Sequence, residues 1–341
     1  MTTTTDRFDL HQPYAAPGRR GMLAWWAIRI ACVTLGILAV LAAGGASYEG
    51  SAVAGDAATY PPPGRLIDVG GYRLHLDCRG EGPETIVMDA GLGHSSLDWS
   101  LVQPALAATT RVCSYDRAGM GWSDPGPAPR SPAQIAEELH ALLSNGAVAG
   151  PYILVGHSLA GKNLRMFARA YPSEVAGMVL IDTRSEQIDI GLSATQIDGF
   201  KGALDGQAML YTWARRLGIA RLFGASLIGE PLVAPPLAQQ MLLFDTAPNA
   251  IATTTAEGLA RSANDGELAG ATLGDMPVIV IAAEASMQGI AGWSAAQQAL
   301  AALSTSGRLV VATTGHAVQL EQPDIVIDVV RSVLTDIGTP R

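Results

Sequence analysis

The sequence contains few of the residues on which metal, nucleotide and nucleic-acid binding depend. Its 341 residues include 3 cysteines and 6 histidines, and 22 lysines and arginines stand against 31 aspartates and glutamates, a net charge of −9. The cysteines and histidines show no metal-ligand spacing. No G-x-G-x-x-G segment joins a strand to a helix, so we expect neither a metal nor another cofactor. No basic stripe with interleaved aromatic residues is present, which argues against nucleic acid as a partner.

Apolar sequence, by contrast, is abundant. Hydrophobic residues make up 48% of the chain, which is enough for a large core, and no internal repeat is visible. Short apolar strands alternate with helical stretches, as a mostly parallel central sheet flanked by helices requires. We therefore predict an α/β fold for residues 64–341.

The first 63 residues form a separate region. Residues 1–20 are polar, and we expect them to form a disordered tail. The run 21–46 is long enough to span a bilayer core of roughly 30 Å. Its one charge, Arg29, lies within reach of the interface, beside two tryptophans that are also favourable there. Because two arginines precede the run, we predict a single-pass transmembrane anchor with the rest of the chain on the extracytoplasmic side.

Other interpretations of this region remain open. A cleaved signal peptide would have its apolar part at residues 30–43 and a cleavage site near Ala46 or Ala54, and it would leave a secreted protein. A buried core helix fits less well, since the run is hydrophobic on all sides. Residues 47–63, which end in Tyr-Pro-Pro-Pro, are expected to form a semi-rigid linker.

A serine at a tight turn is the strongest indication of chemistry. Residues 156–161, Gly-His-Ser-Leu-Ala-Gly, follow an apolar strand and precede a helical segment. This is the layout of a nucleophile elbow, in which the serine sits at a strained apex and its neighbours two positions away must be small. Gly156 and Ala160 meet that requirement. The helix N-terminus would direct N–H groups at the oxygen of Ser158. We interpret Ser158 as a candidate nucleophile.

A histidine near the C-terminus is a matching candidate for the general base. Residues 308–312 read as a strand and residues 324–334 as a helix, so His316 lies on a loop just past the end of a strand. Catalytic residues of open parallel sheets gather at such strand ends.

These motifs together resemble those of α/β-hydrolase fold proteins of the serine hydrolase branch. Residues 315–323, G-H-A-V-Q-L-E-Q-P, are similar to that family's histidine loop, and residues 115–123, Y-D-R-A-G-M-G-W-S, are similar to its Y-D-x-x-G-x-G-x-S segment. The order of the motifs along the chain is also the family's. The resemblance implies that the loop at residues 90–96 contributes one oxyanion N–H, that of Leu92, and that Leu159 after the nucleophile contributes the other.

The acid of the implied triad has two candidates. The position most often used in the family falls near Ser286, which carries no charge, and Glu284 is the carboxylate close to it. A second position used in the family is the end of the strand after the elbow helix, where Asp182 follows residues 177–181. We favour Asp182, with Glu284 as the alternative. A cap for the local turn is the simpler role for Asp182.

The stretch between the acid and the next predicted strand is expected to form a helical cap. The cap covers about residues 183–276, with helices at residues 210–223 and 235–244, and its apolar composition favours a substrate with an apolar portion. Cys78 and Cys113 lie on strands that are neighbours in the family. An extracytoplasmic domain permits a bridge between them, but we expect two buried thiols because flat strand pairs often have unsuitable geometry.

The function that follows is that of a serine hydrolase. Ser158, His316 and Asp182 would hydrolyse a carboxylic ester or related acyl compound through an acyl-enzyme, as a carboxylesterase or lipase-like enzyme does. The alternative is a non-catalytic ligand-binding or receptor protein on the same fold. The sequence does not define the oligomeric state.

Overall fold

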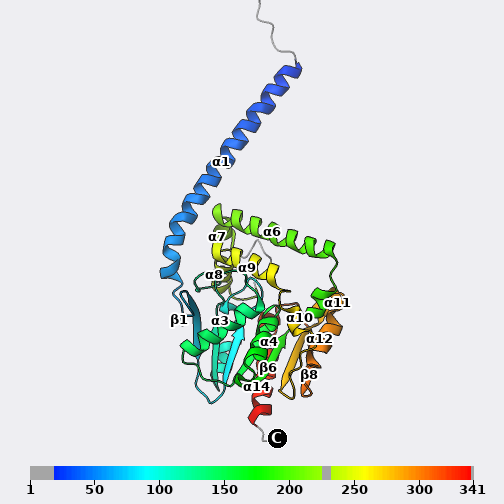
Figure 1. The fold of residues 1–341 in the computed structure, drawn as a ribbon. Coiled ribbons are helices and arrows are strands. Elements are labelled where there is room, and N and C mark those ends of the chain that lie inside the picture. The colour runs from blue at the N-terminus through cyan, green and yellow to red at the C-terminus, as the bar shows by residue number, and fades with distance from the viewer. Residues whose placement is uncertain (1–18, 225–231, 339–341) are drawn as a thin grey trace, which may run out of the picture.

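The chain folds around one twisted sheet with helices on both faces, and a single long helix extends away from it (Figure 1). The computed structural model describes residues 19–224 and 232–338. The eight strands lie in the order β1-β2-β4-β3-β5-β6-β7-β8. The pairs β1–β2 and β2–β4 are antiparallel and all other neighbours are parallel. The strands are β1 Arg65–Asp68, β2 Arg73–Arg79, β3 Thr85–Asp89, β4 Arg111–Tyr115, β5 Tyr152–His157, β6 Val175–Ile181, β7 Val278–Ala283 and β8 Gly307–Ala312.

Two apolar layers hold the sheet between its helices. On one face α3 (Pro132–Asn145), α4 (Ala160–Ala170) and α12 (Trp293–Ala301) contribute to a core that includes Leu154 of β5. On the other face α2 (Gln103–Ala107) and α14 (Pro323–Gly338) pack on a second core that includes Ile153 and Val155. Successive residues of β5 thus face opposite cores, and the strand is buried throughout, as expected of a central parallel strand. The predicted α/β fold is confirmed.

A helical insertion between β6 and β7 forms the cap. It consists of α5 Glu186–Ile190, α6 Ala194–Arg216, α7 Ile219–Phe223, α8 Pro235–Asp245, α9 Pro248–Ala260 and α10 Asp265–Leu268. The helix predicted at residues 210–223 is wrong in its bounds, because two helices meet there. Gly218, with φ 68°, lies between α6 and α7. A left-handed glycine is a common end of a helix, and here it redirects the chain.

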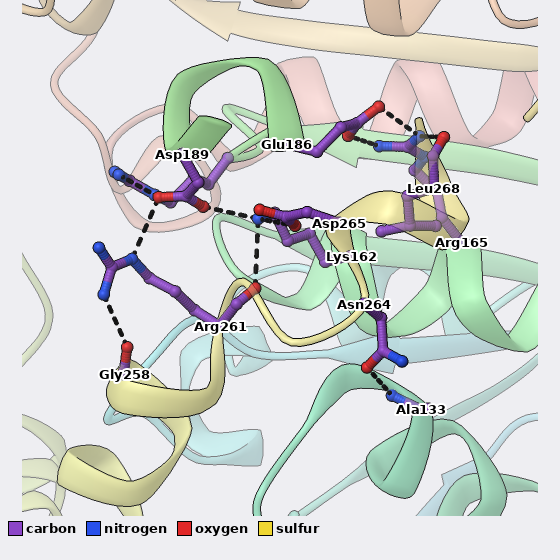
Figure 2. Close-up of polar contacts among 11 residues, drawn as sticks. Ala133, Lys162, Arg165, Glu186, Asp189, Gly258, Arg261, Asn264, Asp265 and Leu268 are labelled. Carbon is purple, nitrogen blue, oxygen red and sulfur yellow. Dashed lines mark hydrogen bonds and ion pairs between the residues drawn. The ribbon is translucent and has the colours of Figure 1, made fainter. Parts of the chain in front are cut away.

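Buried charges attach both ends of the cap to α4 (Figure 2). The Lys162 ammonium of α4 donates to Asp189 Oδ2 of α5 and to Asp265 Oδ1 of α10, each at 2.6 Å, and it has no solvent exposure. Arg165, one turn further along α4, pairs with Glu186 at 2.6 Å. The place where the chain leaves the sheet and the place where it returns therefore share one set of ionic contacts.

The remaining short elements connect these layers. They are the 3-10 helices η1 Ser96–Trp99 and η2 Pro172–Glu174 and the helices α11 Glu284–Gly289 and α13 Val318–Glu321.

The N-terminal helix is longer than the predicted apolar run. Helix α1 spans Arg19–Thr59, and its stretch Gly21–Thr59 is long and apolar enough to cross a membrane by length and composition. In the range predicted as a linker, residues 47–59 are the last part of this helix, and residues 60–63 follow it. The first proline of the range is at position 61, and ion pairs from the cap hold the last turns of the helix. Of the predicted tail, residues 1–18 lie outside the described residues.

The two strand cysteines are bonded, contrary to our expectation. Cys78 of β2 and Cys113 of β4 form a disulfide. The two strands are antiparallel neighbours, and their register places these two residues directly opposite each other. The register, which decides whether two cysteines can meet, is a long-range property that the local sequence does not reveal. Cys32 of α1 is a free, exposed cysteine.

Candidate active site

Ser158 occupies the turn between β5 and α4. Its φ is 53°, a left-handed conformation that is rare for serine, and its N–H donates to the Ile181 carbonyl of β6 at 2.9 Å. A Cβ added at Gly156 would lie 3.2 Å from the Ala160 carbonyl carbon and 2.7 Å from a methyl of Leu164. Glycine at this position therefore lets the helix start close to the strand. The expected strand–serine–helix turn is present.

His316 lies far from Ser158 in the sequence but next to it in the folded protein. The loop after β8 places His316 Nε2 at 2.9 Å from Ser158 Oγ and His316 Nδ1 at 2.5 Å from Asp182 Oδ2. The side chain of His316 is 46% exposed, whereas that of Asp182 is fully buried. The structure thus brings the three predicted residues into one hydrogen-bonded chain, from a carboxylate in the interior to a hydroxyl at the surface of the site.

Four donors surround Asp182. Its Oδ2 accepts from Ser286 Oγ as well as from His316, and its Oδ1 accepts from Trp293 Nε1 at 2.7 Å and from the Ala283 amide at 3.0 Å. Burial raises the pKa of Asp182, but the hydrogen bonds from His316, Ser286 and Trp293 outweigh it and hold the pKa below its ordinary value. The carboxylate is therefore charged at neutral pH and faces Nδ1 of the imidazole.

The alternative acid lies elsewhere. Glu284 begins α11, and its carboxylate accepts from the Gln288 side chain at 3.1 Å, one turn along the same helix. Ser286, two residues further on, is the residue whose side chain bonds to Asp182. The geometry therefore pairs His316 with Asp182 and places Glu284 at the start of the helix to which Ser286 belongs.

The two predicted oxyanion donors lie on loops next to Ser158. Leu159 precedes the first residue of α4, where helix amides have no intrahelical acceptor. Leu92 follows Gly91, whose added Cβ would lie 2.8 Å from His157 Nδ1 and 3.5 Å from Ser158 Cβ. The absence of a side chain at Gly91 therefore allows the loop to approach the serine closely.

A buried arginine holds this loop, and the sequence reasoning missed it. Arg117 donates to the carbonyl oxygens of Ala90 at 2.6 Å and of Gly91 at 2.8 Å. It also pairs with Asp89 at 2.7 Å and with Glu257 of cap helix α9 at 2.9 Å. In a trans peptide the C=O and N–H groups point in opposite directions. The contact with the Gly91 carbonyl therefore directs the Leu92 N–H away from Arg117. The sequence showed the Y-D-R-A-G segment that contains Arg117, but it did not show which residues Arg117 contacts.

A second histidine supports the loop that carries His316. His157 Nε2 lies 2.9 Å from the backbone oxygen of His316, and the ring is buried. Burial lowers the pKa of His157 to about 3, and the neighbouring His316 adds to the effect. At neutral pH His157 is therefore uncharged and can donate from Nε2 to that carbonyl. The sequence indicated a role for His157 only through its position in the elbow motif, directly before Ser158.

A small cavity opens beside the Leu92 loop. It has a volume of about 100 Å³, and its lining includes Leu92, His94, Tyr211 and Asp245. His94 Nδ1 is 3.5 Å from both Asp98 Oδ1 and Asp245 Oδ2. The Asp98 carboxylate raises the pKa of His94 to about 10, against the opposing effect of burial and with a further contribution from Asp245. Since Asp245 ends α8, this contact joins the loop to the cap.

Comparison with known sequences identifies a family to which this chain belongs and several partial relatives. Residues 86–329 match the profile of the Alpha/beta hydrolase family. An uncharacterized protein of Schizosaccharomyces pombe is 32% identical over 200 residues, which are 49% of this chain and 36% of that protein. An uncharacterized vacuolar membrane protein of Saccharomyces cerevisiae is 31% identical over 135 residues, which are 34% of this chain and 21% of that protein. The chain therefore spans less than half the length of these relatives.

Comparison with solved structures supports the fold alone, since the identities are low. A thermophilic esterase from Thermogutta terrifontis has a TM-score of 0.62 at 20% identity, over 81% of this chain and 99% of that chain. An enol-lactonase from Burkholderia xenovorans has a TM-score of 0.60 at 19% identity, over 80% and 100%. The epoxide hydrolase CorEH has a TM-score of 0.65 at 22% identity, over 80% and 98%.

Proposed function

Because the chain belongs to the alpha/beta hydrolase family, we propose that it is a serine hydrolase of a carboxylic ester or related acyl compound with an apolar portion. The observation that carries the proposal is the hydrogen-bonded chain from Asp182 through His316 to Ser158. A buried carboxylate on Nδ1 keeps the proton on that nitrogen and leaves Nε2 free to accept from the serine hydroxyl. A binding protein would not require this order of groups.

In the proposed mechanism Ser158 Oγ attacks the acyl carbon as His316 Nε2 takes its proton. The tetrahedral intermediate collapses when the bond to the alcohol oxygen breaks, and His316 returns the proton to that oxygen. Water then attacks the acyl-enzyme as His316 takes its proton. The bond between the acyl carbon and Ser158 Oγ breaks, His316 returns the proton to that oxygen, and the acid is released. Asp182 stabilises the imidazolium that forms in each step.

The amides of Leu92 and Leu159 are the proposed oxyanion donors. One such donor contributes about 3 kcal/mol to the transition state in comparable sites. Two features support this role: the Leu92 loop lies against Ser158, and Leu159 lies at the N-terminus of α4 with its partial positive charge.

The proposed substrate class follows from the nucleophile. A serine forms an acyl-enzyme with esters and lactones, whereas epoxide opening in this fold uses an aspartate. The esterase and lactonase among the structural neighbours are compatible with the proposal, and the apolar cap favours an apolar acyl or alcohol group.

Active-site labelling tests the function. A fluorophosphonate probe should label the wild-type protein and should not label Ser158→Ala. Ser158→Ala and His316→Ala should each abolish nearly all hydrolysis of p-nitrophenyl esters, and the double variant should be little worse than either, because the residues act as a unit. Full activity of Ser158→Ala, or losses that multiply, would contradict the mechanism.

We further propose that α1 anchors the protein in a membrane with the hydrolase domain on the extracytoplasmic side. The helix has the required length and apolar character, and a disulfide fits an oxidising compartment. The protein should stay with membranes through carbonate washing, and protease should release the domain at residues 60–63, past the end of α1. A soluble mature protein that begins after Ala46 or Ala54 would instead establish a cleaved signal peptide.

A further inference from the structure

The outer surface of the cap carries large apolar side chains. Met209, Leu210 and Trp213 of α6 and Leu222 and Phe223 of α7 are each more than half exposed. The three positions on α6 lie on one side of that helix, because their spacing is that of adjacent turns. We call these five residues the cap face. Helices α6 and α7 are in contact, and large exposed apolar side chains on adjoining helices are typical of an interaction site.

The cap face lies beside the apolar part of α1. Residues Leu38, Leu41 and Tyr48 of α1 and Leu222 and Phe223 of α7 line one groove of about 670 Å³. The backbones touch at one point, where an added Cβ on Gly218 would lie 2.8 Å from the Gly45 carbonyl oxygen. Helix α7 therefore meets α1 at the C-terminal end of the run predicted to span the bilayer.

Ion pairs hold α7 in this place. Arg221 donates to Glu49 at 2.9 Å and to Asp56 at 2.7 Å, and Arg215 also pairs with both. Glu49 and Asp56 are two turns apart on one side of α1, just beyond the apolar run. Charged groups thus lie below the groove, on the side of the hydrolase domain, and apolar groups line it.

The orientation of the helices completes the geometry. Helix α1 extends past the cap and away from the sheet, and α6 lies across the end of the molecule on the side toward which α1 extends (Figure 1). A bilayer that surrounds the apolar run of α1 would therefore lie over α6 and α7. Trp213 and the exposed Arg216 beside it are amphipathic side chains of the kind favoured at the membrane–water interface.

Three neighbouring hollows share lining residues between α1 and the Leu92 loop. The groove against α1 shares Leu217 and Ile219 with a second, apolar groove of about 330 Å³, which Leu210 and Trp213 of the cap face also line. That second groove shares Tyr211 with the cavity of about 100 Å³ at Leu92. The outer two are lined mostly by apolar residues, and polar side chains such as His94 and Asp245 gather at the inner end, beside the proposed oxyanion donor.

We propose that the cap face rests in the membrane interface and that the substrate is an acyl ester lipid that enters from the bilayer between α1 and α7. The apolar chain would occupy the outer two grooves while the ester reaches Ser158. Hydrolysis then consumes one water and yields a fatty acid, or another apolar acid, and an alcohol. This inference rests on the proposed hydrolase function and on the proposed anchor.

A matched pair of esters tests the route of entry. Full-length protein is reconstituted into phosphatidylcholine vesicles and assayed with 4-methylumbelliferyl palmitate in the bilayer and with 4-methylumbelliferyl acetate in the water. The double variant Leu222→Asp/Phe223→Asp should lower the palmitate-to-acetate rate ratio at least tenfold. The control Leu101→Asp/Val311→Asp replaces two exposed apolar residues of the hydrolase domain and should change the ratio less than twofold. An unchanged ratio in the first variant would overturn the proposed entry route.

A second measurement does not depend on activity. Met209→Cys in a Cys32→Ala background is labelled with bimane and reconstituted in the same vesicles. Quenching by lipids with a doxyl group on the acyl chain supports docking of the cap face, whereas quenching by aqueous iodide alone overturns it. A wild-type protein that hydrolyses neither ester and takes up no fluorophosphonate would refute the hydrolase function instead, and the bimane result would still decide the docking.

Discussion

Replacement of Asp182 by asparagine tests directly whether the charge on this residue is needed for catalysis. The backbone at Asp182 has φ 40°, a conformation that asparagine tolerates better than most residues. The side chains are alike in shape, so the fold should persist. The change removes one negative charge and turns one of the two oxygens into an NH₂ group.

The surrounding donors decide which way the amide turns. If the NH₂ group replaced Oδ1, it would face the Trp293 and Ala283 N–H groups and leave both buried without an acceptor, at about 1–3 kcal/mol each. The NH₂ group should therefore replace Oδ2 and face Ser286 and His316. The Ser286 hydroxyl can rotate and accept. His316 Nδ1 must then accept as well, which moves its proton to Nε2, where it opposes the proton of Ser158.

We therefore expect Asp182→Asn to lose about 10⁴ in kcat, the size of the loss in a well-studied protease triad. At about 1.4 kcal/mol for each factor of ten, this corresponds to about 5–6 kcal/mol of transition-state stabilisation. The assay is steady-state hydrolysis of p-nitrophenyl acetate, with thermal unfolding to check that the variant is folded. Glu284→Gln is the matched control and should lose less than threefold.

Two outcomes would refute this reasoning. A larger loss in Glu284→Gln than in Asp182→Asn would move the acid to Glu284 and leave Asp182 as a structural cap. A folded Asp182→Asn variant that keeps more than a tenth of the wild-type kcat would mean that the charge on Asp182 is not needed.

Three further predictions concern the surroundings of the site. Arg117→Lys keeps the charge but not the simultaneous grip on two carbonyl groups, so kcat should fall by up to about 10² while KM changes less than threefold; an unchanged kcat would exclude Arg117 from orienting the Leu92 amide. The raised pKa of His94, about 10, means that its charged form stabilises the fold fully below its unfolded value of about 6.5 and ceases to do so as the pH rises through 10. The difference in melting temperature between wild type and His94→Gln should therefore be largest near pH 6 and shrink toward pH 10, and a constant difference would contradict the ion pair. Loss of the Cys78–Cys113 bridge in a double alanine variant should lower the free energy of unfolding by about 4 kcal/mol, from its sequence separation of 35, and a reducing agent should destabilise the wild type but not the variant.

Local sequence was enough to locate the serine and the histidine. The strand, the small residues and the helix around Ser158 are contiguous in the chain, and so are the strand and loop around His316. Both residues lie where the pattern predicted, 2.9 Å apart. The alternation of apolar strands and helices likewise predicted the α/β fold, because a parallel sheet needs a crossover between neighbouring strands.

Features that depend on distant pairings were not accessible in this way. The choice between Asp182 and Glu284 depends on the direction in which α11 leaves β7, which the sequence does not indicate. Arg117 meets a glutamate 140 residues away. The bridge between Cys78 and Cys113 depends on strand register. The helical course of residues 47–59 is reinforced by arginines more than 150 positions away, at 215 and 221. Each is a contact between segments whose proximity only the folded chain creates.

The buried lysine beneath the cap has a consequence for recombination between related chains. Lys162 meets carboxylates from both ends of the insertion, and removal of one partner from a buried ion pair costs about 3–5 kcal/mol. A chimaera that received a foreign insertion with its ends would therefore inherit a mismatch at position 162 unless that residue were exchanged with it. Crossovers placed inside residues 192–247 would avoid the mismatch, since every member of this ionic network lies outside that range. The two ends of the cap should thus be inherited together with α4. A segment exchanged between those ends should keep Arg215 and Arg221, which pair with Glu49 and Asp56 of α1, and Asp245, which faces His94.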